Sequence, residues 1–129
     1  MDIITTENMH EYSEQQVFDY VVEQLYKQGV PCVENGTDRC MYRGPNGLKC
    51  AAGILIPDEI YNKEWDSKDG KTYDMLVEES LVPETHRELI SELQIAHDDW
   101  AMGSDFLQEF KKAARNCNLQ FNASNYENV

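Results

Sequence analysis

The sequence predicts an α+β fold, a single predominantly helical domain spanning residues 1–129 with one small β-hairpin near residues 39–50. Apolar residues recur at helical spacing in three long segments, which indicates helices that bury one face. The turn-forming sequence Gly44-Pro45-Asn46-Gly47 separates two short segments that could pair as strands. A chain of 129 residues with 41% hydrophobic residues is large enough to form one core without disulfide or metal staples.

The first predicted helix begins after Ser13 and ends at Gly29. Ser13 supplies a hydroxyl N-cap, and Gln16, three residues later, completes a capping box. Gly29 suits a helix stop, and Pro31 prevents continuation. Residues 1–12 show no periodicity and are expected to form a loose arm. The apolar face of this helix comprises Val17, Phe18, Val21, Val22 and Leu25.

The predicted hairpin joins residues 39–43, as one strand, to residues 48–50, as its partner. Residues 51–56 fit either an extension of the second strand or a short buried helix. The helix is favoured for two reasons. Pro57 ends a short apolar run, and a two-stranded hairpin needs another element, such as a short helix, to pack against it.

Short elements are expected in the next part of the chain. A helical turn is predicted at residues 57–61, where a proline opens the segment. Residues 62–72 are polar and contain glycine, so they are predicted to form a loop. Residues 73–77 follow as a short helix.

Two further helices complete the prediction. Pro83 opens a long helix that ends at Gly103, with a stripe of Leu89, Leu93, Ala96 and Trp100 along one side. Ser104 caps the last helix, in which apolar residues recur up to Cys117. Residues 120–129 are polar and are expected to be loose.

The four cysteines, Cys32, Cys40, Cys50 and Cys117, are expected to be free thiols. Their spacing contains no C-x-x-C pair, whereas zinc ligands usually occur as close pairs. Residues 1–14 lack the features of a signal peptide, and no apolar run approaches the roughly 18 residues that a spanning helix needs. A reducing cytoplasm is therefore expected, with no membrane, no metal and no cofactor; a single disulfide or a metal site is the alternative.

The charge is strongly negative and unevenly distributed. The formal net charge is −13, and residues 58–105 hold fourteen acidic and four basic residues, whereas residues 37–57 carry a net charge of +2. Such a surface repels nucleic acid and anionic membranes and attracts basic protein surfaces. The alternative explanation is that the negative charge serves only to keep the protein soluble. The carboxylates expected to bind a partner are Asp58, Glu59, Glu64, Asp66, Asp69, Asp74, Glu78, Glu79, Glu84, Glu88 and Glu92.

No group of residues predicts catalysis. The sequence His97-Asp98-Asp99 combines a base with acids, but adjacent helical residues do not share a face, so His97 is expected to pack beside the apolar stripe. Cys50 beside Lys49 could begin a helix, but it has no partner histidine nearby. The chain is therefore predicted not to be an enzyme.

A small-molecule-binding function is the alternative to protein binding. Arg39, Arg43 and Lys49 could hold the phosphates of a nucleotide signal, and Tyr42 could stack on its base. The same cations could instead neutralise neighbouring acids.

The order C-x-Y-R-G-P-x-G-L-K-C-A-x-G-x-L-I-P-D-E-x-Y, from Cys40 to Tyr61, resembles a recurring signature of small accessory proteins encoded by tailed phages and prophages. The resemblance covers about residues 13–119 and includes a leading helix and a later helix around residues 95–100. It implies a phage origin and a host cytoplasm, and it transfers no catalytic residue. Because small phage proteins are often inhibitors or decoys of host machinery, we expect this one to inhibit or redirect a host protein with a basic surface. A defence or nucleic-acid-processing enzyme would suit, and mimicry of DNA is a sharper version of this hypothesis.

Overall fold

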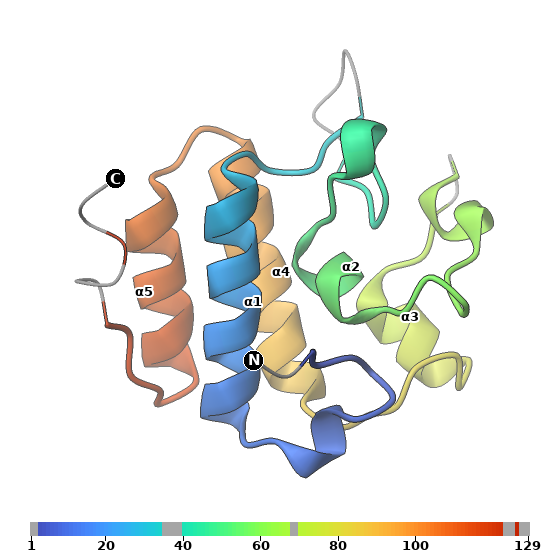
Figure 1. The fold of residues 1–129 in the computed structure, drawn as a ribbon, viewed down its shortest axis with the longest axis horizontal. Helices are drawn as coiled ribbons and strands as arrows, with labels where there is room; N and C mark the ends of the chain where they lie inside the picture. Colours follow the sequence, from blue (N-terminus) through green and yellow to red (C-terminus); the bar gives the residue numbers. More distant parts are fainter. Residues whose placement is uncertain (1–2, 35–39, 68–69, 123–125, 127–129) are drawn as a thin grey trace.

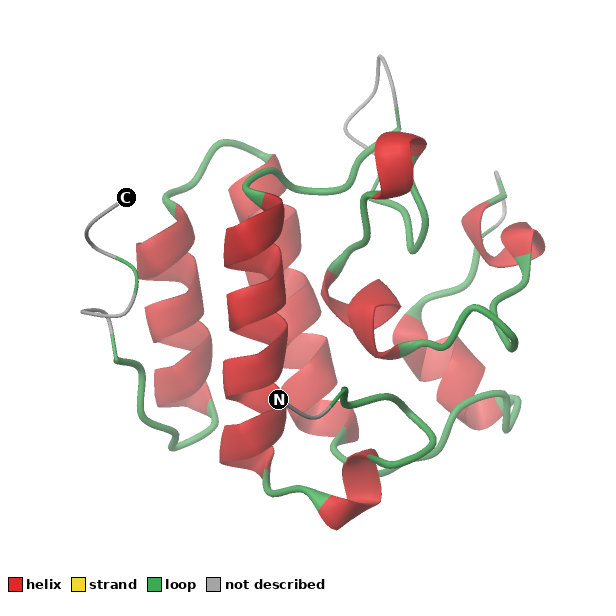
Figure 2. Ribbon diagram, viewed as in Figure 1, coloured by secondary structure: helices red, strands yellow, loops and turns green. Residues whose placement is uncertain are grey.

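The computed structural model describes residues 3–34, 40–67, 70–122 and 126, and these residues form helices joined by loops (Figures 1 and 2). The α-helices are α1 (Glu14–Gln28), α2 (Ala51–Leu55), α3 (Tyr73–Glu78), α4 (Arg87–Ala101) and α5 (Phe106–Asn116). Short 3₁₀-helices lie at Met9–Glu11, Pro45–Gly47 and Lys63–Asp66.

Helix α4 is the centre of the fold. It packs against each of the other four α-helices, and Figure 1 shows it behind α1, with α5 on one side and α2 and α3 on the other. Its buried stripe consists of Leu89, Ile90, Leu93, Ala96 and His97. Burial of this apolar stripe supplies most of the reason for the helix to form, because short isolated helices are marginal in water.

Helix α1 confirms the first predicted helix. The Ser13 hydroxyl accepts the N–H of Gln16 at 3.1 Å, and the Gln16 side chain accepts the N–H of Ser13 at 2.9 Å. Gly29 ends the helix in the left-handed conformation, with φ of 81°. These contacts are local in sequence, which is why the sequence predicts the helix well.

The predicted β-hairpin near residues 39–50 is wrong, and so is the α+β class. Among the described residues there is no strand, only an isolated antiparallel bridge between Val33 and Cys40. The backbone N–H groups of Tyr42 and Arg43 donate to the carboxylate of Asp66, at 2.8 and 3.0 Å, instead of to a neighbouring strand. A side chain far along the chain thus satisfies donors that the hairpin would have paired.

Residues 51–55 form helix α2, so the favoured alternative for this segment is confirmed. The helix lies very close to the segment that precedes it. A Cβ atom on Gly53 would lie 2.4 Å from the carbonyl oxygen of Tyr42, well inside van der Waals contact. Glycine is therefore needed at residue 53 for its lack of a side chain.

Helix α4 begins later than Pro83, the predicted start. His86 has a left-handed backbone, with φ of 60°, so regular helix starts at Arg87. The His86 ring nitrogen Nε2 lies 3.0 Å from the carbonyl oxygens of both Met9 and Tyr12. This ring holds the N-terminal segment against the start of α4.

The segments expected to be loose pack against the helices wherever they are described. Ile4 and Met9 are buried, and the N–H of Thr6 donates to the carbonyl of Leu55 at 2.7 Å. In the segment after α5, the ring of Phe121 packs edge-on against the ring of Phe18, and their centroids are 6.1 Å apart. The arm over residues 3–12 is therefore part of the core and not a loose extension.

Candidate functional site

The carboxylates predicted to bind a partner are mostly on the surface. Asp66 is buried, Glu92 is half-buried, and Asp69 lies outside the described residues. The remaining eight are exposed: Asp58, Glu59, Glu64, Asp74, Glu78, Glu79, Glu84 and Glu88.

Some of these carboxylates gather around one groove of about 830 Å³, which we call the acidic groove. Its acidic lining residues are Glu14, Asp74, Glu84 and Glu88, which come from the first turn of α1, from α3, from the loop before α4 and from the first turn of α4. The end of α5 contributes Cys117 to the same groove. Packing thus collects negative charge from four separate segments.

Arg87 is the only lysine or arginine among the described residues that line the acidic groove. Its Nε atom lies 2.8 Å from an Asp74 carboxylate oxygen, and its Nη2 atom lies 3.6 Å from Glu78. One cation therefore pairs with the carboxylates of Asp74 and Glu78, while four acidic residues line the groove.

The thiol of Cys117 is also affected by negative charge at this end of the molecule. Its pKa is raised, first by burial and then by the nearby carboxylates of Glu92, Glu14 and Glu88. Each of these charges disfavours the thiolate, so all three act on one point at the end of α5. The sequence prediction did not include Glu14, because it drew its carboxylates from residues 58–105, where acidic residues are most concentrated.

The other predicted carboxylates do not line this groove. Asp58 pairs with Arg43 at 2.9 Å, and that guanidinium holds the pKa of the carboxyl below its usual value. Glu79 pairs with Lys71 at 2.7 Å. Asp58 and Glu79 are thus engaged in ion pairs away from the acidic groove.

Asp66 has a structural role. Besides the two backbone N–H groups of Tyr42 and Arg43, its carboxylate accepts the hydroxyl of Tyr61. Its side chain faces the loop at residues 42–43 and not solvent, so it is not placed to meet a partner.

Arg43, predicted as a phosphate ligand in the alternative hypothesis, has all five of its N–H donors occupied. Nε and Nη2 donate to Asp58, Nη1 to the carbonyls of Tyr42 and Gly53, and Nη2 also to the carbonyl of Ile56. The guanidinium also lies over the Tyr61 ring, 4.9 Å from its centroid. This side chain fastens α2 to the preceding loop.

The other residues of the alternative ligand site are not assembled around a common point. Tyr42 is buried, and its hydroxyl donates to the carbonyl of Lys71 at 2.6 Å, so the side chain is held within the fold. Lys49 lines a separate depression together with Lys27. Arg39 lies outside the described residues.

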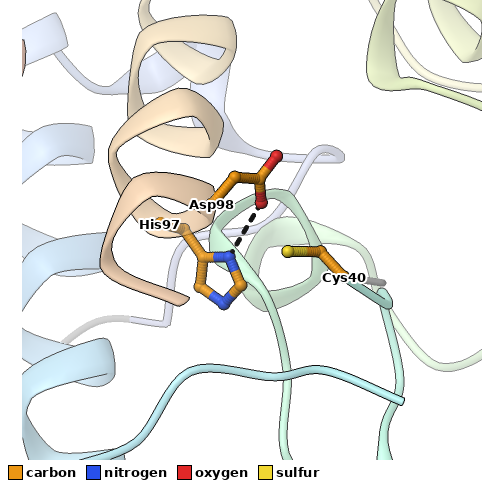
Figure 3. A group of neighbouring side chains, drawn as sticks. All are labelled: Cys40, His97 and Asp98. Carbon is orange, nitrogen blue, oxygen red and sulfur yellow. Dashed lines mark hydrogen bonds and ion pairs between the residues drawn. The ribbon is translucent and has the colours of Figure 1, made fainter. Parts of the chain in front are cut away.

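Cys40, His97 and Asp98 form a cluster that joins the loop after α1 to α4 (Figure 3). One ligand-type atom from each lies within 4.8 Å of the others. Nδ1 of His97 is 3.0 Å from an oxygen of Asp98, and Nε2 of His97 accepts the backbone N–H of Cys32 at 3.0 Å. The expected packing role of His97 agrees with its complete burial, but the expectation that Asp98 projects away from it is wrong.

The hydrogen bonds of His97 argue against a metal ion at this cluster. Because a backbone N–H can only donate, Nε2 carries the lone pair and Nδ1 carries the proton that it donates to Asp98. A metal bound at Nδ1 would need the opposite tautomer, which would place two N–H groups against each other. With the imidazole engaged at both nitrogens, too few donor groups remain for the four ligands of zinc.

The cysteines are poor nucleophiles in this fold. All four are free. Burial raises the pKa of Cys32 to about 11 and also raises the pKa values of Cys40 and Cys50. For Cys40 the neighbouring carboxylate of Asp98 adds to the effect. Thiolates, the reactive form, are therefore disfavoured at neutral pH.

No described helix has the length and apolar character required to cross a membrane. Comparison of the chain with models of protein families, with curated proteins and with solved structures gave no match.

Proposed function

We propose that this protein is a binding protein whose acidic groove engages a basic surface of another protein. The observation that carries the proposal is the convergence of Glu14, Asp74, Glu84 and Glu88 on one groove whose only described lysine or arginine, Arg87, is already paired. Opposite charge across an interface steers association and selects partners.

The signature from Cys40 to Tyr61 adds an origin to the proposal. On its resemblance to phage accessory proteins, the partner is a host protein and the site of action is the host cytoplasm. Binding would inhibit or redirect that host protein. Enzymes that hold nucleic acid on a basic face are suitable partners, because a row of carboxylates can occupy the place of phosphates.

The first experiment measures binding of a fluorescent lysine- and arginine-rich peptide as a probe of the groove. We compare the wild-type chain with the triple variant Glu14→Gln, Glu84→Gln and Glu88→Gln. The matched control is Glu59→Gln, Glu64→Gln and Glu109→Gln, which removes the same charge from acids that do not line the groove.

We expect the groove variant to bind the peptide at least about 10-fold more weakly and to show a shallower dependence on salt. The control variant should lose less than about threefold. Equal losses in the two variants would show that only net charge matters, and the groove would no longer be the site.

The partner itself is sought by affinity capture from bacterial cells with all three proteins in parallel, followed by mass spectrometry. A protein retained by wild type and control but lost from the groove variant supports the proposal. If every captured protein is retained equally by the groove variant, the proposed site is wrong.

A further inference from the structure

An open depression of about 460 Å³ lies beside the acidic groove, where α3 ends and the loop to α4 begins. We call it the apolar depression; its lining residues are Val77, Ser80, Leu81, Val82, Pro83 and Glu84. Glu84 also lines the acidic groove, so the two sites share this residue. Asp74 of the groove and Val77 of the depression are three residues apart on α3 and are therefore neighbours on its surface. One extended segment of a partner that crosses Glu84 can thus contact both sites.

The apolar side chains of this depression are not fully covered by the fold. Leu81 is 42% exposed, Pro83 is exposed and Val77 is half-buried. Val82, between Leu81 and Pro83, is buried and belongs to the core, so it holds the loop in place. A single exposed leucine is ordinary in a folded protein. Apolar side chains gathered around one depression beside a charged groove are instead typical of the apolar centre and polar rim of a protein interface.

The turn that shapes the apolar depression is fixed by backbone hydrogen bonds. Ser80 has a left-handed backbone, with φ of 60°. Its N–H donates to the carbonyl of Val77 at 3.0 Å, and the N–H of Leu81 donates to the carbonyl of Leu76 at 2.9 Å. These two bonds form a Schellman motif at the end of α3. Because the walls of the depression are formed in advance, a partner loses less binding energy to the ordering of this loop.

The charge around the apolar depression selects the kind of partner. Among the described residues that line the depression there is no lysine or arginine, and the charged one is Glu84. The adjoining groove adds Glu14, Asp74 and Glu88. An anionic membrane surface would be repelled here, whereas a basic protein segment is attracted. The apolar occupant of the depression is therefore sought on the same segment as the cations of the groove.

We propose that the partner segment carries one large apolar side chain beside its lysines or arginines. The apolar side chain occupies the depression around Leu81, while the basic residues lie in the acidic groove. This inference rests on the proposed function and adds a second determinant of specificity to it. Charge steers the partner to the groove, and burial of the apolar side chain adds affinity that salt does not screen.

The test is a fluorescence anisotropy titration of the whole chain with peptide probes. The parent probe is a lysine- and arginine-rich peptide without apolar residues. The leucine probes carry one leucine at successive positions before or after the basic run. We expect the best leucine probe to bind the wild-type chain at least about fivefold more tightly than the parent probe. This gain should persist as sodium chloride is added, although both affinities fall, because salt screens charge pairing and not apolar burial.

Three variants locate the gain. Leu81→Ser should reduce it to less than about twofold while binding of the parent probe stays within about twofold of wild type. Val77→Thr, which keeps the branched shape, should lower the gain at least about twofold. The control Met75→Ser changes another exposed apolar residue of α3, 46% exposed, that lines neither site, and it should keep the full gain. Binding of the parent probe is the check that each variant is folded, and if Leu81→Ser fails it, Val77→Thr decides the question.

A neutral leucine peptide, with serines in place of the basic residues, tests whether the two sites act together. It should bind at least about 10-fold more weakly than the best leucine probe, and equal binding would contradict the inference.

No gain from leucine at any position, or a gain that survives both Leu81→Ser and Val77→Thr, would overturn the inference. If the parent probe still binds through the groove carboxylates, that result leaves the proposed function intact. Failure of the parent probe to depend on those carboxylates would reject the proposed function and this inference together.

Discussion

The backbone N–H of Cys32 donates to Nε2 of His97 across 3.0 Å, joining the loop after α1 to the middle of α4. The other ring nitrogen of His97 donates to Asp98, so both sides of a completely buried imidazole are used. This arrangement assigns His97 to the framework of the fold and fixes its neutral Nδ1–H tautomer.

His97→Phe should lower the free energy of unfolding by about 2 to 4 kcal/mol, because it leaves the Cys32 N–H and the Asp98 carboxylate without this partner. Urea unfolding monitored by circular dichroism measures the loss. His10→Phe, at an exposed residue, is the control and should change stability by less than about 0.5 kcal/mol. Two-bond ¹H–¹⁵N correlation spectra should show the Nδ1–H tautomer, and an Nε2–H signal would contradict the assignment.

Arg43→Lys should destabilise the fold by about 2 to 4 kcal/mol although it preserves the charge. An ammonium group cannot reproduce the fork of donors that reaches three backbone carbonyls and Asp58. The comparison is Arg115→Lys, on the exposed side of α5, which should cost less than about 0.5 kcal/mol. Similar midpoints of urea unfolding for the two variants would show that the Arg43 contacts contribute little.

Two tyrosine-to-phenylalanine substitutions should have different effects on the stability of the fold. Tyr73→Phe removes a buried hydroxyl that has no hydrogen-bond partner in the described part of the chain, so stability should stay unchanged or rise by up to about 1 kcal/mol. Tyr42→Phe removes the bond to the carbonyl of Lys71 and should cost about 1 kcal/mol. Thermal unfolding of the two proteins under one set of conditions makes the comparison. A larger loss for Tyr73→Phe would mean that its hydroxyl has a partner in solution.

Stability should fall as the pH rises above about 9 under reducing conditions. Burial raises the pKa of the Cys32 thiol from 9.0 to about 11, so between these values the folded chain keeps a proton that the unfolded chain has lost. Fewer protons on the unfolded state mean that stability decreases with pH in this window and levels off above it for this group. Urea unfolding at intervals from pH 8 to 10.5 measures the slope, which Cys32→Ala should reduce. Stability that is constant across this range would contradict the raised pKa.

The sequence predicts the parts of this fold whose contacts are local. Ser13, Gln16 and Gly29 define α1 through bonds within a few residues, and these bonds form as expected. The start of α4 is displaced because His86 takes a left-handed backbone and binds the N-terminal segment, whose carbonyls lie more than seventy residues earlier in the chain. Local rules contain no information about such a contact.

The hairpin prediction fails for the same reason. Gly44-Pro45-Asn46-Gly47 does form a turn, but Asp66 takes the backbone donors of Tyr42 and Arg43 that strand pairing requires. An acidic residue in a polar loop also looks solvent-exposed in the sequence, so Asp66 was expected on the binding surface. Asp66 and Trp65 beside it are both buried by tertiary packing, which no spacing rule describes.

Only part of the acidic groove is predictable from the sequence. The excess of carboxylates is a property of composition, and Asp74, Glu84 and Glu88 belong to the expected set. Glu14 lies far earlier in the chain, so its place in the groove depends on the packing of α1 and α4, which the sequence pattern does not describe.

The position of α4 has a consequence for synthesis of the chain on the ribosome. Helices α1, α2 and α3 are synthesised before the segment that begins at Arg87, and each of them packs against that segment. Much of their apolar surface therefore stays uncovered until α4 has emerged from the ribosome, whereas the packing of α1 on α2 can form earlier.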